Sequence, residues 1–265
     1  MDNRPIGMFD SGVGGLTVLK EVMKKNPNED IIYLGDSKRF PYGSKSKESI
    51  IQLTKNGIDF LIQKGVKAII IACGTATSQA LEEMQKIYKI PIMGIIEPTV
   101  EYIKNSNKRN IGIIATTGTI RSRGWERALK EQIPNLQITS KACALLAPMA
   151  EEGWTANIVA KEAIHEYLKD LKPLPLDALI LGCTHYPLFE ELIKKELGEN
   201  IEIINTGTTL AIKIQEELKK RNLLSNKKEA NYQFYLTDVE TNFIQVAQKL
   251  LQDQNKIEKI LLANI

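Results

Sequence analysis

Several features that would place a protein in a specialised class are absent from this sequence of 265 residues. No run approaches the roughly 20 apolar residues of a membrane-spanning helix. Residues 1–5 lead into an apolar segment without the stretch that a secretory signal requires. The 35 basic and 32 acidic residues nearly balance, and the basic ones are scattered, which is not the pattern of a nucleic-acid-binding surface. We therefore expect a cytoplasmic protein that binds neither nucleic acid nor a membrane.

Cysteine and histidine are scarce, with three and two residues. An odd number of cysteines without a secretion signal argues against a disulfide framework, so reduced thiols are expected. A zinc site at Cys73, Cys183 and His185 is conceivable, but no Cys-x-x-Cys spacing supports it. We expect no metal and no cofactor.

Two of the cysteines end short apolar runs. Residues 178–181 lead through Gly182 to Cys183, and residues 67–72 lead to Cys73. Each run is too short for an ordinary helix and is followed by apolar residues at helical spacing, which predicts a strand, a turn and a helix. A thiol at the start of a helix meets the positive end of the helix dipole, which favours the thiolate.

The two cysteines are 110 positions apart, and other segments repeat at nearly the same offset, such as residues 6–12 with 111–118 and residues 95–97 with 203–205. A fixed internal period indicates a duplicated architecture, and strands alternating with helices predict parallel sheets. We expect two pseudo-symmetric, doubly wound α/β domains, residues 1–97 plus 208–265 and residues 98–207. The active site is expected in the cleft between them.

Within each half, the same order of elements is expected. The predicted strands are residues 6–9, 31–34, 67–72, 92–96, 111–115, 136–142, 178–181, 201–204 and 232–236. The second half is expected to begin directly after Pro98, with one helix over residues 122–131 and a loop over residues 147–153. The loop would correspond to residues 40–43 of the first half.

Polar residues follow the ends of these strands, where open parallel sheets bind ligands. If the two halves face each other, Cys73 and Cys183 oppose one another about a small ligand. Inverting a stereocentre next to a carboxylate requires a base on one face and an acid on the other, and two equivalent thiols supply both. Asp10 is the expected partner of the first thiol, and His185 that of the second. The carboxylate that orients His185 is Glu151 or Glu152, and the spacing from Pro148 favours Glu151.

Four motifs, at residues 10–16, 41–43, 72–76 and 182–187, resemble those of the bacterial glutamate racemases over nearly the whole chain. The resemblance implies a cofactor-independent enzyme that interconverts L- and D-glutamate, supplies D-glutamate to peptidoglycan and forms homodimers. It further implies that Cys73 and Cys183 are the two bases, assisted by Asp10, Glu151 and His185. The implied substrate contacts are Asp10, Ser11, Tyr42, Gly43, Gly74, Thr75, Thr184 and His185.

The chain departs from this family at Gly74, where Asn is usual. Either a backbone N–H or a water replaces the amide, or substrate choice has moved toward another acidic amino acid such as aspartate. A non-catalytic amino-acid-binding protein is a further alternative. Gly12, Gly14 and Thr17 with Asp36 also imitate a dinucleotide fingerprint, although its third glycine is absent.

Overall fold

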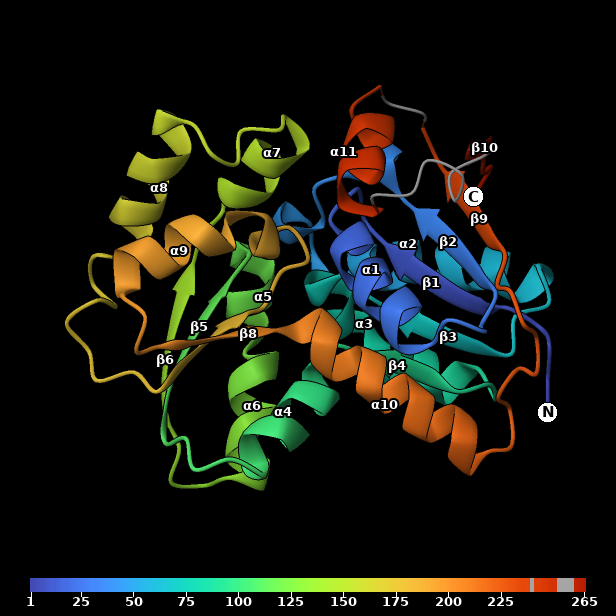
Figure 1. Ribbon diagram of the computed structural model, residues 1–265, viewed down its shortest axis with the longest axis horizontal. Helices are drawn as coiled ribbons and strands as arrows, with labels where there is room; N and C mark the ends of the chain where they lie inside the picture. Colours follow the sequence, from blue (N-terminus) through green and yellow to red (C-terminus); the bar gives the residue numbers. More distant parts are fainter. Residues whose placement is uncertain (239–240, 252–259) are drawn as a thin grey trace.

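The computed structural model describes residues 1–238, 241–251 and 260–265, which form helices packed around two sheets (Figure 1). The strands are β1 Ile6–Asp10, β2 Ile31–Gly35, β3 Ala68–Ile71, β4 Ile92–Gly94, β5 Asn110–Ala115, β6 Gln137–Ala142, β7 Ala178–Leu181, β8 Glu202–Asn205, β9 Tyr232–Leu236 and β10 Ile260–Leu262. The α-helices are α1 Gly15–Lys25, α2 Lys47–Gln63, α3 Gly74–Ile87, α4 Ile96–Lys104, α5 Thr117–Ser122, α6 Gly124–Gln132, α7 Leu146–Glu151, α8 Ile158–Leu168, α9 Glu190–Leu197, α10 Thr206–Lys220 and α11 Thr241–Leu251.

The first sheet has the strand order β10-β9-β2-β1-β3-β4, and the second has the order β6-β5-β7-β8. Every pairing in both sheets is parallel. The predicted fold class of two parallel α/β sheets is confirmed, and β9 and β10 join the sheet of the first half. The exact domain boundaries, near residues 97 and 207, stay a prediction.

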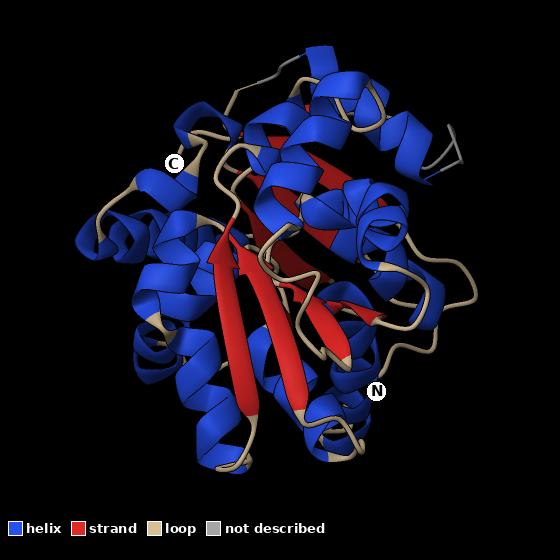
Figure 2. Ribbon diagram, turned by 90° about the vertical axis from the view of Figure 1, so that its left-hand side faces the viewer, coloured by secondary structure: helices blue, strands red, loops and turns tan. Residues whose placement is uncertain are grey.

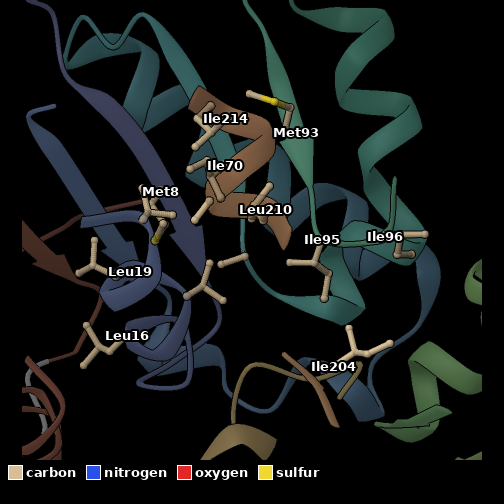
Figure 3. Close-up of a cluster of buried hydrophobic side chains, with 14 of the residues drawn as sticks. Met8, Leu16, Leu19, Ile70, Met93, Ile95, Ile96, Ile204, Leu210 and Ile214 are labelled. Carbon is tan, nitrogen blue, oxygen red and sulfur yellow. The ribbon is translucent and has the colours of Figure 1, made fainter. Parts of the chain in front are cut away.

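Helices cover both faces of the first sheet because successive strand residues point to opposite sides. Met8 and Ile70 belong to one apolar cluster, which includes Leu210 and Ile214 of α10 (Figure 3). Phe9 and its neighbours on the other face pack against residues of α2 and α3.

The second sheet is layered in the same way, with helices on either side of its strands (Figure 2). Ile113 and Ile180 share a cluster with Trp125 of α6 and with one face of the first sheet. On the opposite face, Leu179 and Leu181 pack toward α7, α8 and α9. One continuous apolar cluster therefore contacts both sheets and fixes how their strand ends meet.

The strand predicted over residues 92–96 was wrong at its C-terminal end. β4 ends at Gly94, and α4 begins at Ile96, inside the strand expected over residues 92–96. Ile96, Val100 and Ile103 are buried at helical spacing, and Pro98 lies in the first turn, where its missing N–H has no helical partner to lose.

Two further expectations were also wrong. Residues 117–132 form α5 and α6 rather than one helix from residue 122, because Arg123 adopts a left-handed conformation with φ of 53° between them. Residues 147–153 are not simply a loop, since Leu146–Glu151 forms α7 and buries Leu146, Ala147 and Ala150. β10 was not predicted. The other predicted strands are present, with ends shifted by at most one residue.

Candidate active site

A cavity of about 280 Å³ lies where the strand ends of the two sheets meet. Cys73 follows β3 of the first sheet, Cys183 follows β7 of the second, and both line this cavity. Asp10 and Glu151 are the only predicted site residues that do not line it. Those that do are Ser11, Tyr42, Gly43, Cys73, Gly74, Thr75, Cys183, Thr184 and His185.

Cys183 is joined to a buried ring and a carboxylate. Its Sγ lies 3.7 Å from Nδ1 of His185, and Nε2 of that ring lies 2.6 Å from Oε1 of Glu151. The N–H of Val13 also donates to this carboxylate oxygen over 3.0 Å. Burial lowers the pKa of His185, but the contacts with Cys183 and Glu151 outweigh it and hold the pKa well above its usual value. The imidazole therefore tends to hold a proton that it can donate to the sulfur of Cys183.

Glu151 is the last residue of α7, a helix that lies where the sequence predicted a loop. The neighbouring Glu152 caps that helix with its backbone N–H. Glu151 is thus the carboxylate that the fold brings to the histidine.

Cys73 has a different environment. Its thiol donates to Oγ of Ser11 over 3.6 Å. Burial and the carboxylate of Asp10 raise the pKa of Cys73 to about 12, although a hydrogen bond from the N–H of Ala76 lowers it. The expectation that the start of the helix favours a thiolate was therefore wrong for Cys73, because desolvation outweighs one helix-end N–H.

The turn after Cys183 also differs from the expectation. A short 3₁₀ turn, Tyr186–Phe189, contains Pro187, and α9 begins only at Glu190. The N-terminus of α9 is therefore not directly after the cysteine, and the sulfur instead contacts Nδ1 of His185 at 3.7 Å.

Asp10 is fully buried and contacts Thr184, which lines the cavity. Its carboxylate accepts hydrogen bonds from the N–H of Gly12 at 3.1 Å and from Oγ1 of Thr184 at 3.2 Å. Burial raises the pKa of Asp10 to about 6, while the charge of His185 and the hydrogen bond from Gly12 pull it down. This carboxyl can therefore gain or lose a proton near neutral pH.

The glycine-rich turn after β1 packs directly on the second half of the chain. A Cβ built at Gly14 would lie 2.4 Å from Nδ1 of His185 and 2.6 Å from Oγ1 of Thr184. The space beside this turn, where a dinucleotide fingerprint would hold the phosphates, is therefore filled by the side chains of His185 and Thr184. The carboxylate of Asp36, which would bind a ribose in that alternative, is buried and accepts hydrogen bonds from Arg39, Tyr42 and Thr237.

Three hydroxyls form a cluster across the two halves. Oγ1 of Thr75 lies 2.9 Å from Oγ1 of Thr116 and 3.2 Å from Oγ1 of Thr119, and the last two are 3.0 Å apart. Thr116 lines the cavity with Thr75. Thr116 stood in a polar strand-end cluster in the sequence, yet it was not predicted as a site residue, and neither was Thr119.

Other lining residues were not predicted as site residues, although Phe40, Ala147 and Pro148 lie in segments that were expected to be loops. They are Phe40, Ser44, Arg121, Ala144, Ala147 and Pro148. The ring of Phe40 lies 5.4 Å from that of His185, centroid to centroid, and closes one side of the cavity.

Gly74 brings the two halves unusually close together. A Cβ built at this position would lie 2.2 Å from the carbonyl oxygen of Gly182. The two glycines are neighbours of the two cysteines, Gly74 following Cys73 and Gly182 preceding Cys183. The absence of a side chain at residue 74 therefore permits the close approach of the two cysteine-bearing turns.

The remaining cysteine is structural. Cys143 is fully buried in the core of the second half, and its carbonyl accepts a hydrogen bond from the hydroxyl of Tyr186 at 2.7 Å.

In residues 1–238, 241–251 and 260–265, no group of three His, Cys, Asp or Glu side chains is arranged to hold a metal ion. The same ranges contain no helix with both the length and the apolar composition needed to cross a membrane.

Comparison with known proteins places the chain among racemases. The family described as Asp/Glu/Hydantoin racemase matches residues 16–213. The chain is 40% identical to a glutamate racemase of Geobacter metallireducens over 250 residues, which cover 94% of this chain and 93% of that protein.

Solved structures agree with this relationship. A glutamate racemase of Bacillus anthracis has a TM-score of 0.95 and 36% identity, with coverage of 100% of this chain and 99% of that one. A glutamate racemase of Francisella tularensis in complex with D-glutamate has a TM-score of 0.93 and 38% identity, with coverage of 100% and 98%. On its sequence and its fold, this chain belongs to the glutamate racemases of the Asp/Glu/Hydantoin racemase family.

Proposed function

We propose that this racemase interconverts L- and D-glutamate by moving a proton at Cα between Cys73 and Cys183, without a cofactor. The observation that carries the proposal is that the two sulfurs line one cavity of about 280 Å³ but come from different sheets. A substrate bound between them presents opposite faces of Cα to the two sulfurs. That is the requirement for inversion by two bases.

The protons balance in each direction. One cysteine, as the thiolate, takes the Cα proton, and the electron pair of the broken C–H bond delocalises into the adjacent carboxylate. The thiol of the other cysteine donates a proton to the opposite face of Cα. The two sulfurs exchange protonation states in each turnover, and the reverse reaction uses them in the opposite order.

The two sulfurs require different support because their surroundings differ. The His185–Glu151 pair can exchange a proton with Cys183 through Nδ1 at 3.7 Å. On the other side, Asp10, with a pKa raised to about 6 by burial, is suited to receive a proton that the poorly acidic Cys73 must release.

Binding of the substrate carboxylates is assigned mainly to uncharged donors. Gly74 and Thr75 are the first residues of α3, whose N–H groups have no helical partner, and the threonine hydroxyls face the same cavity. Ser11, Tyr42, Gly43, Thr184 and His185 complete the proposed contacts. Fixed donors of this kind also stabilise the negative charge that develops when the Cα proton leaves.

Glutamate is favoured as substrate because the relatives that cover nearly the whole chain are glutamate racemases, one of them in complex with D-glutamate. Another acidic amino acid such as aspartate is the alternative, since Gly74 provides no side-chain amide. We also propose, on the resemblance to bacterial glutamate racemases, that the enzyme is a cytoplasmic homodimer whose D-glutamate supplies peptidoglycan synthesis.

The direct test is a circular-dichroism assay of L- and D-glutamate and L- and D-aspartate, with no added cofactor, in parallel with Cα deuterium uptake in heavy water. We expect both glutamate enantiomers to reach the same racemic end point and to gain deuterium. Faster turnover of aspartate than of glutamate would identify aspartate as the preferred substrate. Binding of glutamate without any deuterium uptake would identify a non-catalytic binding protein and contradict the proposal.

A further inference from the structure

A second hollow adjoins the candidate active site. It has a volume of about 340 Å³ and shares Gly43, Ser44 and Arg121 with the lining of the reaction cavity. Every charged residue in its lining is a cation. We call these four residues the basic recess: Lys45, Lys47, Arg121 and Arg127.

The positive charge of the basic recess is not neutralised by ion pairs. Across the described ranges, none of its four side chains takes part in a salt bridge, unlike Lys55, Lys86 or Lys141. The guanidinium of Arg127 donates to the carbonyl oxygen of Ser122 at 2.9 Å. This hydrogen bond positions the guanidinium, but a neutral acceptor does not cancel its positive charge.

One acid that senses the charge of the recess is Glu83 of α3. Its pKa is lowered mainly by its hydrogen bond with Lys86, and the charge of Lys47 contributes last. Because Lys86 pairs with Glu83 at 2.8 Å, the carboxylate is already neutralised. The basic recess therefore keeps a net positive field.

Arg121 connects the two hollows. It lies near the end of α5 and is exposed, and among the residues that the structure describes it is the only lysine or arginine that lines the reaction cavity. The other titratable groups in that lining are Tyr42, the two thiols and His185. An anion that moves from the basic recess into the reaction cavity passes this guanidinium.

We infer that the basic recess is an entrance that captures anionic amino acids and delivers them, past Arg121, to the two cysteines. The inference rests on the proposed function, in which the substrate has two carboxylates and one ammonium group and hence a net negative charge. Clefts with charge of one sign raise association rates by roughly 10 to 10³-fold. The field extends about 8 Å at physiological ionic strength, so added salt weakens it. A neutral amino acid such as glutamine gains nothing from it.

The test removes the three cations that line the recess but not the reaction cavity, in the variant Lys45→Gln/Lys47→Gln/Arg127→Gln. The matched control is Lys20→Gln/Lys161→Gln/Lys228→Gln, which removes the same charge from exposed, unpaired residues that line neither hollow. The kcat/KM for glutamate is measured from low salt to about 0.5 M salt, where screening is nearly complete.

At low salt, we expect the recess variant to lose roughly tenfold in kcat/KM with kcat unchanged, and to approach the parent as salt is added. The control is expected to follow the parent. A recess variant that matches the control at low salt, or one whose loss lies in kcat and persists at high salt, overturns the inference.

Failure of the proposed function gives a different result, because the parent then racemises no acidic amino acid. The recess is still tested in that case by calorimetric binding of citrate, an anionic probe, to the same three proteins. Citrate binding that is weakened by salt and lost only in the recess variant supports the entrance, and equal binding by all three proteins overturns it.

Discussion

Gly74→Ala is the sharpest test of how the site is held together. Its Cβ would lie 2.2 Å from the carbonyl oxygen of Gly182, whereas real contacts of this kind stay beyond 3.0 Å, so the two turns must separate by at least 0.8 Å. Both turns carry a proposed base. Misplacement of reacting groups by about 1 Å can cost roughly 10²-fold in rate, so we expect kcat/KM to fall about 10- to 100-fold.

The same strain lowers stability. Overpacking of a well-packed site costs about 1 to 3 kcal/mol, and alanine returns at most about 1 kcal/mol through its helix propensity. We expect a net loss of about 1 to 2 kcal/mol in the free energy of unfolding, measured by urea denaturation. Activity is measured by circular dichroism with both glutamate enantiomers.

Gly124→Ala is the matched control because Gly124 is also the first residue of a helix. Its Cβ would meet Cβ of Ser78 at 3.1 Å, a contact that a small shift relieves. We expect this variant to keep its activity and stability. If Gly74→Ala is as active and as stable as Gly124→Ala, the close approach does not hold the two turns in register. Tighter glutamate binding by Gly74→Asn than by Gly74→Ala would show that an amide at this position reaches the substrate.

Three further predictions concern individual side chains. Cys73→Ala and Cys183→Ala are each expected to lower racemisation by at least about a hundredfold while far-UV circular dichroism stays unchanged; near-full turnover by either variant would exclude that sulfur as a base. Asp10 has a pKa raised from 3.8 to about 6, so the folded state binds its proton more tightly and this contribution to stability is lost as pH rises between these values. The urea-derived stability of Asp10→Asn relative to the parent should therefore improve by about 2 kcal/mol from pH 4 to pH 7, and a constant difference would contradict the shift. Lys67 and Glu29 form a buried pair at 2.5 Å, so Lys67→Met should cost about 3 to 5 kcal/mol by leaving a buried charge; a double variant with Glu29→Leu should recover much of it, and equal losses in both would argue against that reason.

The acidity of the Cys73 thiol could be predicted only in part from the sequence, because it depends on how deeply the thiol is buried. A cysteine at the start of a helix suggests an acidic thiol, but Cys73 is also buried and close to Asp10, and these two effects raise its pKa. Helix position can be inferred from local sequence. Burial and the nearness of Asp10, which is 63 positions earlier in the chain, come from tertiary packing.

The same distinction applies to the secondary structure. Strands such as β1 and β7 were predicted because a short apolar run between polar residues is informative by itself. α7 was missed because Pro148 and Gly153 indicate a loop, and its burial of Leu146 and Ala150 against the second sheet stabilises a helix that its local sequence does not favour.

The sequence by itself determined the duplicated α/β architecture and the two cysteine-bearing turns, because apolar periodicity and an internal repeat are local or evenly spaced signals. Only the tertiary structure decided which groups surround each sulfur: Glu151 reaches His185 through α7, Thr116 and Thr119 reach Thr75 across the two halves, and Arg121 lies between the cavity and the basic recess. These contacts depend on how the two sheets pack around a shared apolar cluster. The spacing of residues along the chain does not determine how far apart the two sheets lie.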